Sequence, residues 1–224
     1  MTDIKKDLPD SEERIAEFEQ ELAKVLDLDP CRQESLDPDI SAGWRVQADE
    51  CLHLLIDVQE RLAPIIQDRE SVERNVRIMV QACQALAIPT LVTEQYPKGL
   101  GPTVAEIKAV CDAAGAQYFA KTRFTAATPE VLAAIEASGR QNIILTGMEA
   151  HICVWQTAMD LLDLGYQVYL AEDAIGSRQA QHKQRALENL ILYGAEVLPV
   201  EGLLFELIQD SRHPAFKIIS NLIK

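Results

Sequence analysis

TGMEAHICVWQTAMDLL, residues 146–162, carries an apolar run through a short turn directly into an amphipathic helix. A strand that leads into a helix in this way is the building unit of a parallel α/β sheet. Apolar residues recur along the helix at helical spacing (Trp155, Met159, Leu162), which predicts that it packs on that sheet. Cys153 stands at the start of the helix, where free backbone N–H groups and the helix dipole favour a thiolate over a thiol. The alternative is that Cys153 is a small packing residue.

Six short apolar runs of this kind occur from residue 51 onward, and helical stretches separate them. The runs are CLHLLID (51–57), IPTLVT (88–93), AQYFA (116–120), NIILTG (142–147), YQVYLAE (166–172) and AEVLPV (195–200). Strands that are apolar along their whole length are typical of a sheet that is buried on both faces. We therefore predict an α/β fold of the Rossmann-like kind, a three-layer sandwich with a mostly parallel six-stranded sheet.

The stretches between the runs have the periodicity and the end signals of helices. Helices are predicted at about 70–87, 102–115, 128–139 and 177–194. The third has Thr128 as N-cap, Pro129 at the first helical position and Gly139 at its end. No glycine-rich phosphate-binding motif follows any of the strands, so a nucleotide-binding fold of the usual kind is not indicated.

The first 48 residues differ from the rest in composition. Of the net charge of −14, residues 1–50 carry −9 and the remainder only −5. Residues 10–27 are predicted to form an amphipathic helix and are followed by a loop rich in Pro, Asp and Ser. We divide the chain into an acidic helix-and-loop extension (1–48) and a catalytic domain (49–224); a role of the extension in binding a partner is the alternative to packing on the domain.

Composition also limits where the protein acts and on what. Its acidic balance disfavours binding to nucleic acid and to anionic membrane surfaces. The N-terminus lacks the apolar stretch of a signal peptide, and no run approaches the roughly 18 apolar residues that span a bilayer. The five cysteines are odd in number and form no CxxC pair, which fits reduced thiols. We expect a cytoplasmic protein.

Three chemically reactive residues end or follow the predicted strands. Asp57 closes the first run, Lys121 follows the third, and Cys153 follows the fourth. Each has a simpler explanation on its own: a helix N-cap for Asp57, a solvent-reaching side chain for Lys121 and core packing for Cys153. Ligands of open α/β sheets bind beyond the carboxyl ends of the strands, so the three should meet there. A thiol nucleophile, a base and a cation together predict covalent catalysis.

With these residues the sequence resembles the isochorismatase-like cysteine hydrolases, a superfamily that includes nicotinamidase and N-carbamoylsarcosine amidase. The family's Asp–Lys–Cys triad corresponds to Asp57 in LLIDVQ, Lys121 in FAKTRF and Cys153 in TGMEAHICV. The resemblance further implies an oxyanion hole formed by the backbone N–H groups of Glu149 and Cys153, with a cis peptide bond between Met148 and Glu149. It covers residues 50–224 and leaves the first 48 largely outside.

A narrower resemblance is to the isochorismatase domain-containing branch of this superfamily, carried by residues 93–107, 173–178 and 213–224. The sequence departs from nicotinamidases, which hold a divalent metal with an Asp-x-His pair and a further histidine. TEQYP stands at the matching place, and His53, His151, His182 and His213 show no metal-ligand spacing. We therefore expect no metal and no other cofactor, and nicotinamide is not favoured as substrate.

The function predicted from the sequence is hydrolysis of a C–N bond in a small amide, imide or ureido compound through a thioester on Cys153. Isochorismatases that cleave a vinyl ether lack this cysteine in the family. Gln95, Tyr96 and Phe124 flank the strand ends and are candidate substrate contacts, although both aromatic residues could equally pack in the core or at an interface. Relatives of this fold commonly form homo-oligomers. The alternatives are a binding or scaffold protein, a vinyl-ether hydrolase, and a redox-sensing thiol that would need a second cysteine nearby.

Overall fold

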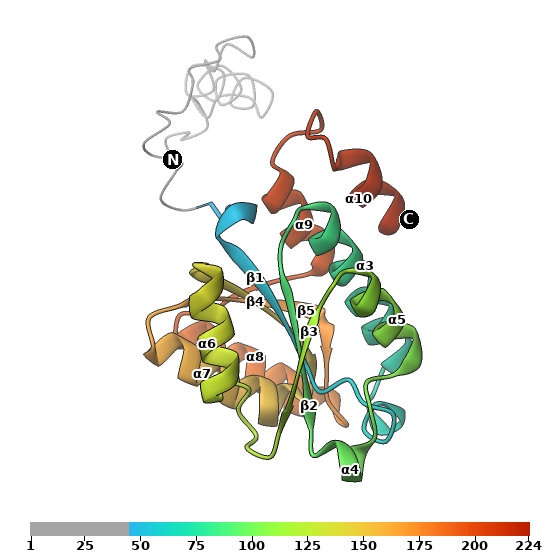
Figure 1. Ribbon diagram of the computed structural model, residues 1–224, viewed down its shortest axis with the longest axis vertical. Helices are drawn as coiled ribbons and strands as arrows, with labels where there is room; N and C mark the ends of the chain where they lie inside the picture. The colour runs from blue at the N-terminus through green and yellow to red at the C-terminus, as the bar shows by residue number, and fades with distance from the viewer. Residues whose placement is uncertain (1–44) are drawn as a thin grey trace, which may run out of the picture. The chain divides into compact units, whose positions relative to one another are not determined.

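A six-stranded, wholly parallel sheet forms the centre of the protein (Figure 1). The computed structural model describes residues 45–224, so the predicted helix at 10–27 and its following loop lie outside the described residues. The strands lie in the order β3-β2-β1-β4-β5-β6. Their bounds are β1 Cys51–Ile56, β2 Thr90–Gln95, β3 Gln117–Lys121, β4 Asn142–Met148, β5 Gln167–Gly176 and β6 Glu196–Leu198.

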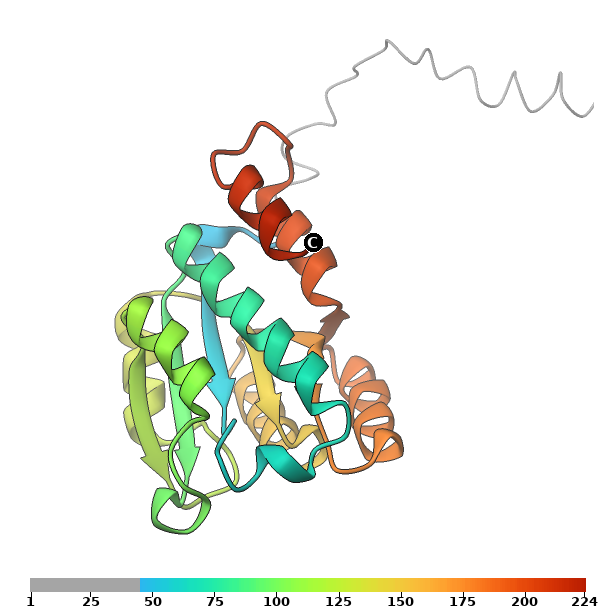
Figure 2. The ribbon, with the colours of Figure 1, turned by 90° about the vertical axis from the view of Figure 1, so that its right-hand side faces the viewer.

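Helices cover both faces of the sheet, which gives the three layers predicted from the sequence (Figures 1 and 2). One layer contains α3 (Arg69–Ala85), α5 (Ala105–Ala113), α9 (Val200–Ile208) and α10 (Phe216–Leu222). The opposite layer contains α6 (Pro129–Ser138), α7 (Trp155–Asp163) and α8 (Ala180–Leu192). Shorter elements are η1 (Ala48–Glu50), η2 (Ala63–Ile65), α4 (Pro97–Leu100) and the π-helical turn η3 (Ala150–Val154).

The alternation of side chains along each strand creates two separate cores. In β1, Cys51 and Leu55 belong to the core beneath α3 and α9, whereas Leu52, Leu54 and Ile56 belong to the core beneath α6, α7 and α8. All six residues of β1 are buried, since the strand lies in the middle of the sheet. Burial on both faces is the reason why the strand reads as a continuous apolar run.

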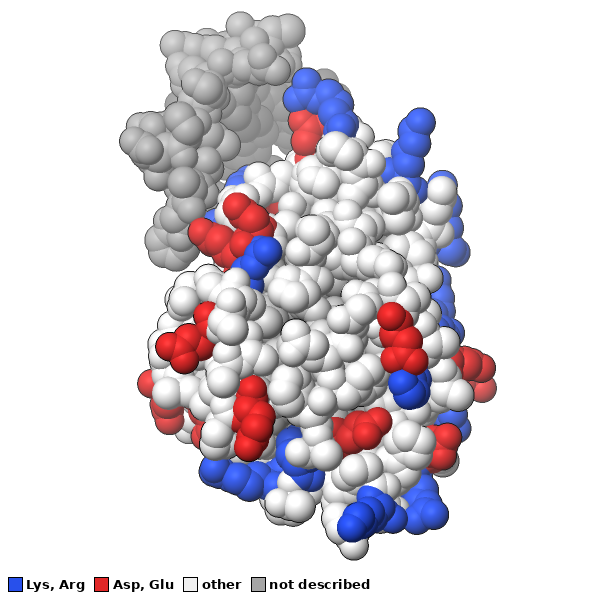
Figure 3. All heavy atoms as spheres, in the orientation of Figure 1, with Lys and Arg blue, Asp and Glu red and all other residues white. Residues whose placement is uncertain are grey.

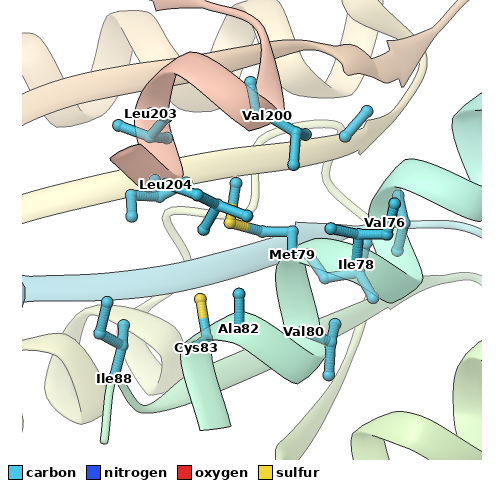
Figure 4. Close-up of a cluster of buried hydrophobic side chains, with 14 of the residues drawn as sticks. Val76, Ile78, Met79, Val80, Ala82, Cys83, Ile88, Val200, Leu203 and Leu204 are labelled. Carbon is cyan, nitrogen blue, oxygen red and sulfur yellow. The ribbon is translucent and has the colours of Figure 1, made fainter. Parts of the chain in front are cut away.

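The first core is closed by packing between two helices that are far apart in the sequence. Figure 4 shows Val200, Leu203 and Leu204 of α9 facing Met79 and Ala82 of α3. All five side chains are almost completely buried. Contacts of this kind fix the helical layer against the sheet and leave the carboxyl ends of the strands free to form a site.

The helix-end signals read from the sequence are confirmed for α6. The side chain of Thr128 accepts a hydrogen bond from the backbone N–H of Val131, Pro129 begins the helix, and Gly139 ends it in the left-handed conformation. The predicted bounds of β5 were too short, because the strand continues through Asp173 to Gly176. Within residues 45–224, no helix combines the length and the apolar character needed to cross a membrane.

A neutral histidine is buried in the centre of the sheet. His53 of β1 is fully buried, and its Nε2 lies 2.8 Å from Thr146 Oγ1 of β4. Its Nδ1 lies 3.3 Å from Thr90 Oγ1 of β2. The two hydroxyl groups satisfy the ring, and burial lowers the pKa of His53 from 6.5 to about 3.

We expect this histidine to make the fold sensitive to mild acid. Below about pH 6.5 the unfolded chain binds a proton on His53, whereas the folded protein keeps the ring neutral down to about pH 3. The free energy of unfolding should therefore fall with falling pH, by about 2 kcal/mol between pH 6.5 and 5. Urea unfolding at several pH values measures this slope, and His53→Gln should flatten it. An equal slope in both proteins would contradict the assignment.

Candidate active site

The site begins where β1 ends. Asp57 follows the last residue of β1, has a positive φ of 53° and is fully buried. Its Oδ1 accepts a hydrogen bond from Thr93 Oγ1 at 2.8 Å, and its Oδ2 accepts one from Lys121 Nζ at 2.6 Å. A carboxylate at this depth is costly unless it is paired and hydrogen-bonded, and here both oxygens have a partner.

Strand register brings Lys121 to Asp57 across an intervening strand. Lys121 ends β3 opposite Gln95 of β2, and Thr93 of β2 lies opposite Ile56 of β1. The Lys121 ammonium group also donates to Gln95 Oε1 at 2.9 Å and to the carbonyl oxygen of Phe124 at 3.0 Å. The simpler explanation for this lysine, a side chain that reaches solvent, is therefore wrong: its side chain is 1% exposed.

Cys153 approaches the pair from the other side, through the turn that follows β4. Gly147 near the end of β4 has a φ of +118°, and a Cβ there would lie 2.0 Å from the carbonyl oxygen of Ile56. Only glycine allows this close approach of β4 to the end of β1. The chain then forms the π-helical turn η3, which contains Cys153, before α7 begins at Trp155.

The resting form of Cys153 differs from the sequence-based expectation. Burial raises the pKa of the Cys153 thiol to about 12, the negative charge of Asp57 raises it further, and Lys121 opposes the shift. Burial therefore works against the thiolate that the helix end is predicted to favour. Desolvation and the adjacent carboxylate outweigh the helix dipole, so the thiol carries its proton beside a carboxylate that can accept it.

Asp57 and Cys153 meet at a small cavity, and Lys121 lies behind Asp57 as its ion-pair partner. The cavity measures about 110 Å³. The other lining residues are Leu62, Gln95, Leu100, Phe124, Glu149 and Ile152. A cavity of this size suits the reacting end of a small molecule.

The residues predicted to form the oxyanion hole lie at this cavity. Glu149 and Cys153 both line it, and the peptide bond between Met148 and Glu149 is cis, as the resemblance implies. The carbonyl oxygen of Glu149 accepts hydrogen bonds from the N–H groups of Ile152 and Val154. The side chain of Glu149 is held in turn by Arg178, whose backbone N–H and Nε both donate to Glu149 Oε2 at 3.1 Å.

Of the three candidate substrate contacts, the structure brings two to the cavity. Gln95 and Phe124 line it, whereas Tyr96 is not among the lining residues and is 54% exposed. The Gln95 side chain is already engaged, because its Oε1 accepts from Lys121 and its Nε2 donates to the carbonyl oxygen of Thr122 at 2.8 Å. Gln95 therefore positions Lys121.

Sequence reasoning missed two residues that hold this arrangement. Thr93 bonds the Asp57 carboxylate, and the Gln59 side chain bonds both the backbone N–H and the carbonyl oxygen of Gln95 at 2.8 and 3.0 Å. The signal for Thr93 was its place at the end of an apolar strand, one register position from Asp57. Gln59 carries no comparable signal, because it acts through a loop.

Internal hydrogen bonds engage the TEQYP stretch, which the sequence resemblance matches to the metal-binding stretch of nicotinamidases. Glu94 Oε1 accepts from the backbone N–H and the hydroxyl of Thr103, both at 2.8 Å, and Gln95 is engaged as described. Among residues 45–224, no group of three or more His, Cys, Asp and Glu side chains could hold a metal ion. His151 pairs with Ser177 and His182 and does not line the cavity. These residues do not fit the metal of that family.

The described cysteines do not support a disulfide switch at Cys153. Cys51, Cys83 and Cys111 are fully buried in the core beneath α3, whereas Cys153 belongs to the core on the opposite face of the sheet. The sheet thus separates Cys153 from every other cysteine in residues 45–224, and Cys31 lies outside that range.

Comparison with known families agrees with this geometry. The Isochorismatase domain model matches residues 51–202. The chain belongs to the isochorismatase family. Isochorismatase domain-containing protein 2 of Danio rerio is 41% identical over 171 residues, which cover 76% of this chain and 85% of the relative. Isochorismatase domain-containing protein 1 of the same fish is 35% identical over 218 residues, which cover 92% and 76%.

A solved structure of this isochorismatase family extends the likeness to three dimensions. The structure titled MAR1 ribonuclease from Caenorhabditis elegans superposes with a TM-score of 0.76 at 36% identity and covers 80% of this chain and 92% of that one. The nicotinamidase PncA of Bacillus subtilis, at 17% identity and a TM-score of 0.59 over 66% of this chain and 98% of that one, shares the fold. The resemblance read from the sequence is therefore confirmed at the level of family and fold.

Proposed function

We propose that this isochorismatase-family protein is a cysteine hydrolase that cleaves a C–N bond of a small amide, imide or ureido compound. One observation carries the proposal. A buried Asp57–Lys121 ion pair, 0% and 1% exposed in its side chains, lies at the same cavity as the thiol of Cys153. A buried ion pair is rarely needed for stability, because well-packed apolar residues of similar volume often stabilise a core as well or better. A thiol nucleophile, in contrast, needs a base and a cation beside it.

In the first half of the reaction, Asp57 takes the proton of Cys153 as the sulfur attacks the substrate carbonyl carbon. The carbonyl oxygen becomes negatively charged and accepts hydrogen bonds from the backbone N–H groups of Glu149 and Cys153. The C–N bond then breaks, and the leaving nitrogen takes the proton from Asp57. A thioester on Cys153 and a free amine or ammonia result.

In the second half, Asp57 removes a proton from a water molecule that attacks the thioester carbon. The C–S bond breaks, the sulfur recovers its proton from Asp57, and the carboxylic acid leaves. Lys121 supports both halves by stabilising the ionised form of Asp57 through the 2.6 Å contact. Thr93 orients the Asp57 carboxylate through its hydrogen bond to Oδ1, and Gln95 positions the ammonium group of Lys121.

Alkylation with iodoacetamide tests the role of Asp57. At neutral pH we expect Cys153 to be the main labelled cysteine among those described, and Asp57→Asn to slow its labelling at least about tenfold, because the proton acceptor is lost. Peptide mass spectrometry locates the adduct and gives its rate. The other described cysteines are fully buried, so accessibility alone could make Cys153 the main labelled thiol. The decisive readout is therefore the labelling rate of Cys153 in Asp57→Asn compared with that in the surface control Asp112→Asn. Equal rates in all three proteins would count against an activated thiol.

A second candidate function comes from the relatives. The similar Caenorhabditis elegans protein is named MAR1 ribonuclease, which suggests RNA cleavage as an alternative activity. The acidic composition argues against it here, because a net charge of −14 disfavours contact with a phosphate backbone. Incubation with single-stranded RNA distinguishes the two functions, because RNA cleavage that is retained in Cys153→Ala would favour a ribonuclease.

The presence of Asp57, Lys121 and Cys153 together disfavours the remaining alternatives, a scaffold protein and a vinyl-ether hydrolase.

Oligomeric state and location belong to the same proposal. An exposed apolar run at the end of α8, formed by Ile191, Leu192 and Tyr193, supports a homo-oligomer, and Leu192 is 83% exposed. The four free cysteines in the described part of the chain suit a reducing compartment, which supports the cytoplasm. We propose that no metal or cofactor takes part, since the stretch that would bind it is internally hydrogen-bonded.

A further inference from the structure

A second cavity, larger than the one at Cys153, lies along α8. This α8 cavity measures about 400 Å³ and is lined by residues from the start of α3, the carboxyl end of β5, α8 and β6. The first three of these segments lie next to one another in Figure 2. Among residues 45–224, none lines both the α8 cavity and the cavity at Cys153. Its volume falls within the range of pockets that bind small molecules, about 300–1,000 Å³.

Much of the wall of the α8 cavity is apolar. Aliphatic side chains come from all four segments and are Val72, Ile175, Leu187, Ile191 and Val197. Val72, Ile175 and Leu187 are buried, whereas Ile191 is exposed near the end of α8. A wall of this kind favours an aliphatic or aromatic group, because covering it removes apolar surface from water.

Two opposite charges belong to the same wall. Lys183 of α8 and Glu172 of β5 both line the cavity, and both are half-buried. They form no ion pair, because no carboxylate oxygen of the described residues lies within 4.0 Å of Lys183 Nζ. Burial lowers the pKa of Lys183, and the charge of Glu172 is the main influence that opposes this shift. Both charged groups have therefore lost part of their hydration without gaining a partner.

This placement differs from that of the charged side chains in Figure 3, which project from the outer surface of the protein. The other polar side chains of the α8 cavity are mostly engaged within the protein; they are Gln67, Ser177, Gln184 and Glu188. Asp68 also lines the cavity, is exposed and makes no side-chain hydrogen bond to the helix that it precedes. The described part of the chain thus leaves one ammonium group and two carboxylates available, beside an apolar wall.

We infer that the α8 cavity binds a small zwitterion, namely an α-amino acid with an apolar side chain. The carboxylate of the ligand pairs with Lys183, its ammonium group pairs with Glu172 and Asp68, and its side chain covers the aliphatic wall. A ligand with only one of these charges would leave the opposite charge of the cavity without a partner. The inference does not depend on the proposed function, because the two cavities share no described residue.

Isothermal titration calorimetry with four compounds tests each part of the inference. L-Leucine has all three features, 3-methylbutylamine lacks the carboxylate, 4-methylpentanoate lacks the ammonium group, and glycine lacks the apolar side chain. We expect L-leucine to bind with a dissociation constant of about 1 mM or lower, and the other three compounds to bind at least about tenfold more weakly. None of the four contains an amide, so hydrolysis at Cys153 does not interfere.

Substitution of Lys183 tests which residue recognises the carboxylate. Lys183→Met should weaken the binding of L-leucine at least about tenfold, because a charged hydrogen bond is lost. It should leave 3-methylbutylamine bound no more weakly than before, so that the preference for L-leucine disappears. Lys217→Met makes the same change at an exposed position of α10 and should alter neither affinity. Lys183→Gln replaces Lys183→Met if the latter lowers the urea midpoint.

The carboxylates are tested in the same way against 4-methylpentanoate. Glu172→Gln should weaken the binding of L-leucine about tenfold, and Asp68→Asn about threefold, because the exposed charge of Asp68 is better screened. Neither change should weaken 4-methylpentanoate, which has no ammonium group. Asn tolerates the positive φ of 54° at position 68. Glu136→Gln, at an exposed position of α6, is the matched control.

Several results would overturn the inference. A dissociation constant of L-leucine above about 1 mM would do so, as would 3-methylbutylamine that binds as tightly as L-leucine, which would indicate a cation site. Equal affinities for L-leucine in Lys183→Met and Lys217→Met would place the ligand elsewhere. Cys153→Ala should bind L-leucine with unchanged affinity, and a loss there would move the ligand to the Cys153 cavity. None of these results bears on hydrolysis, which is measured separately.

A second copy of the chain is the competing occupant, because the exposed Ile191 belongs to the apolar run at the end of α8. Light scattering of the unmodified protein, Lys183→Met and Lys217→Met distinguishes it from a small ligand. We expect the same mass in solution for all three proteins. A change of mass in Lys183→Met alone, together with no binding of L-leucine to the unmodified protein, would assign the α8 cavity to a subunit contact and overturn the inference.

Discussion

Cys153→Ala should abolish turnover of any small amide that the unmodified protein hydrolyses, with a loss of kcat/KM of at least about 10³-fold. Among the described residues that line the cavity, the thiol is the strongest nucleophile, because the other side chains are apolar, amide or carboxylate. Because the three residues act as one unit, removing the nucleophile also removes the rate enhancement that Asp57 and Lys121 provide. The measurement is release of ammonia or amine from a panel of small amides, imides and ureido acids.

Cys111→Ala provides the matched control for this prediction. It makes the same chemical change at a fully buried cysteine of α5, in the core on the other face of the sheet. Its kcat/KM should stay within about twofold of that of the unmodified protein, with a small loss of stability from the cavity left behind. Intact-protein mass spectrometry adds an independent readout, since an acyl adduct should appear on Cys153 and never in Cys153→Ala. Hydrolysis that survives in Cys153→Ala would place the chemistry elsewhere.

Most of the fold was predictable because burial leaves a direct mark on the sequence. The six apolar runs correspond to the six strands of a parallel sheet, and the helix between Thr128 and Gly139 is bounded by the capping residues that its ends require. The extension of β5 to Gly176 was not predictable in the same way. Residues 172–173 interrupt the apolar run with two acidic side chains, and the end of β5 pairs with β4 only after a register shift between Leu145 and Gly147, which depends on tertiary contacts.

The candidate site was partly predictable for a related reason. Reactive residues at the carboxyl ends of parallel strands share one edge of the sheet. The sequence alone therefore predicts that Asp57, Lys121 and Cys153 lie close together. The protonation state of Cys153 was not predictable, because it is set by desolvation and by the distance to Asp57. The engagement of Gln95 by Lys121 and Gln59 likewise depends on side-chain geometry that spacing does not encode.

Lys121→Met should destabilise the protein by about 3–5 kcal/mol, because it removes one partner of a buried ion pair and leaves the carboxylate of Asp57 uncompensated. The double variant Asp57→Asn/Lys121→Met should recover most of that loss, since it leaves no buried charge and Asn tolerates the positive φ of position 57. Urea unfolding gives the four free energies of a double-mutant cycle. Cys153 labelling should nevertheless stay slow in the double variant, because stability is restored without a base.

The two readouts together decide what the ion pair is for. If the pair served folding, the double variant would remain strongly destabilised, because two buried polar groups would have lost their partners. If it serves catalysis, stability returns while the reactivity of Cys153 does not, and the loss appears in the chemistry alone. A Lys121→Met protein within about 1 kcal/mol of the unmodified one would contradict both readings, because breaking a buried ion pair should cost several kcal/mol.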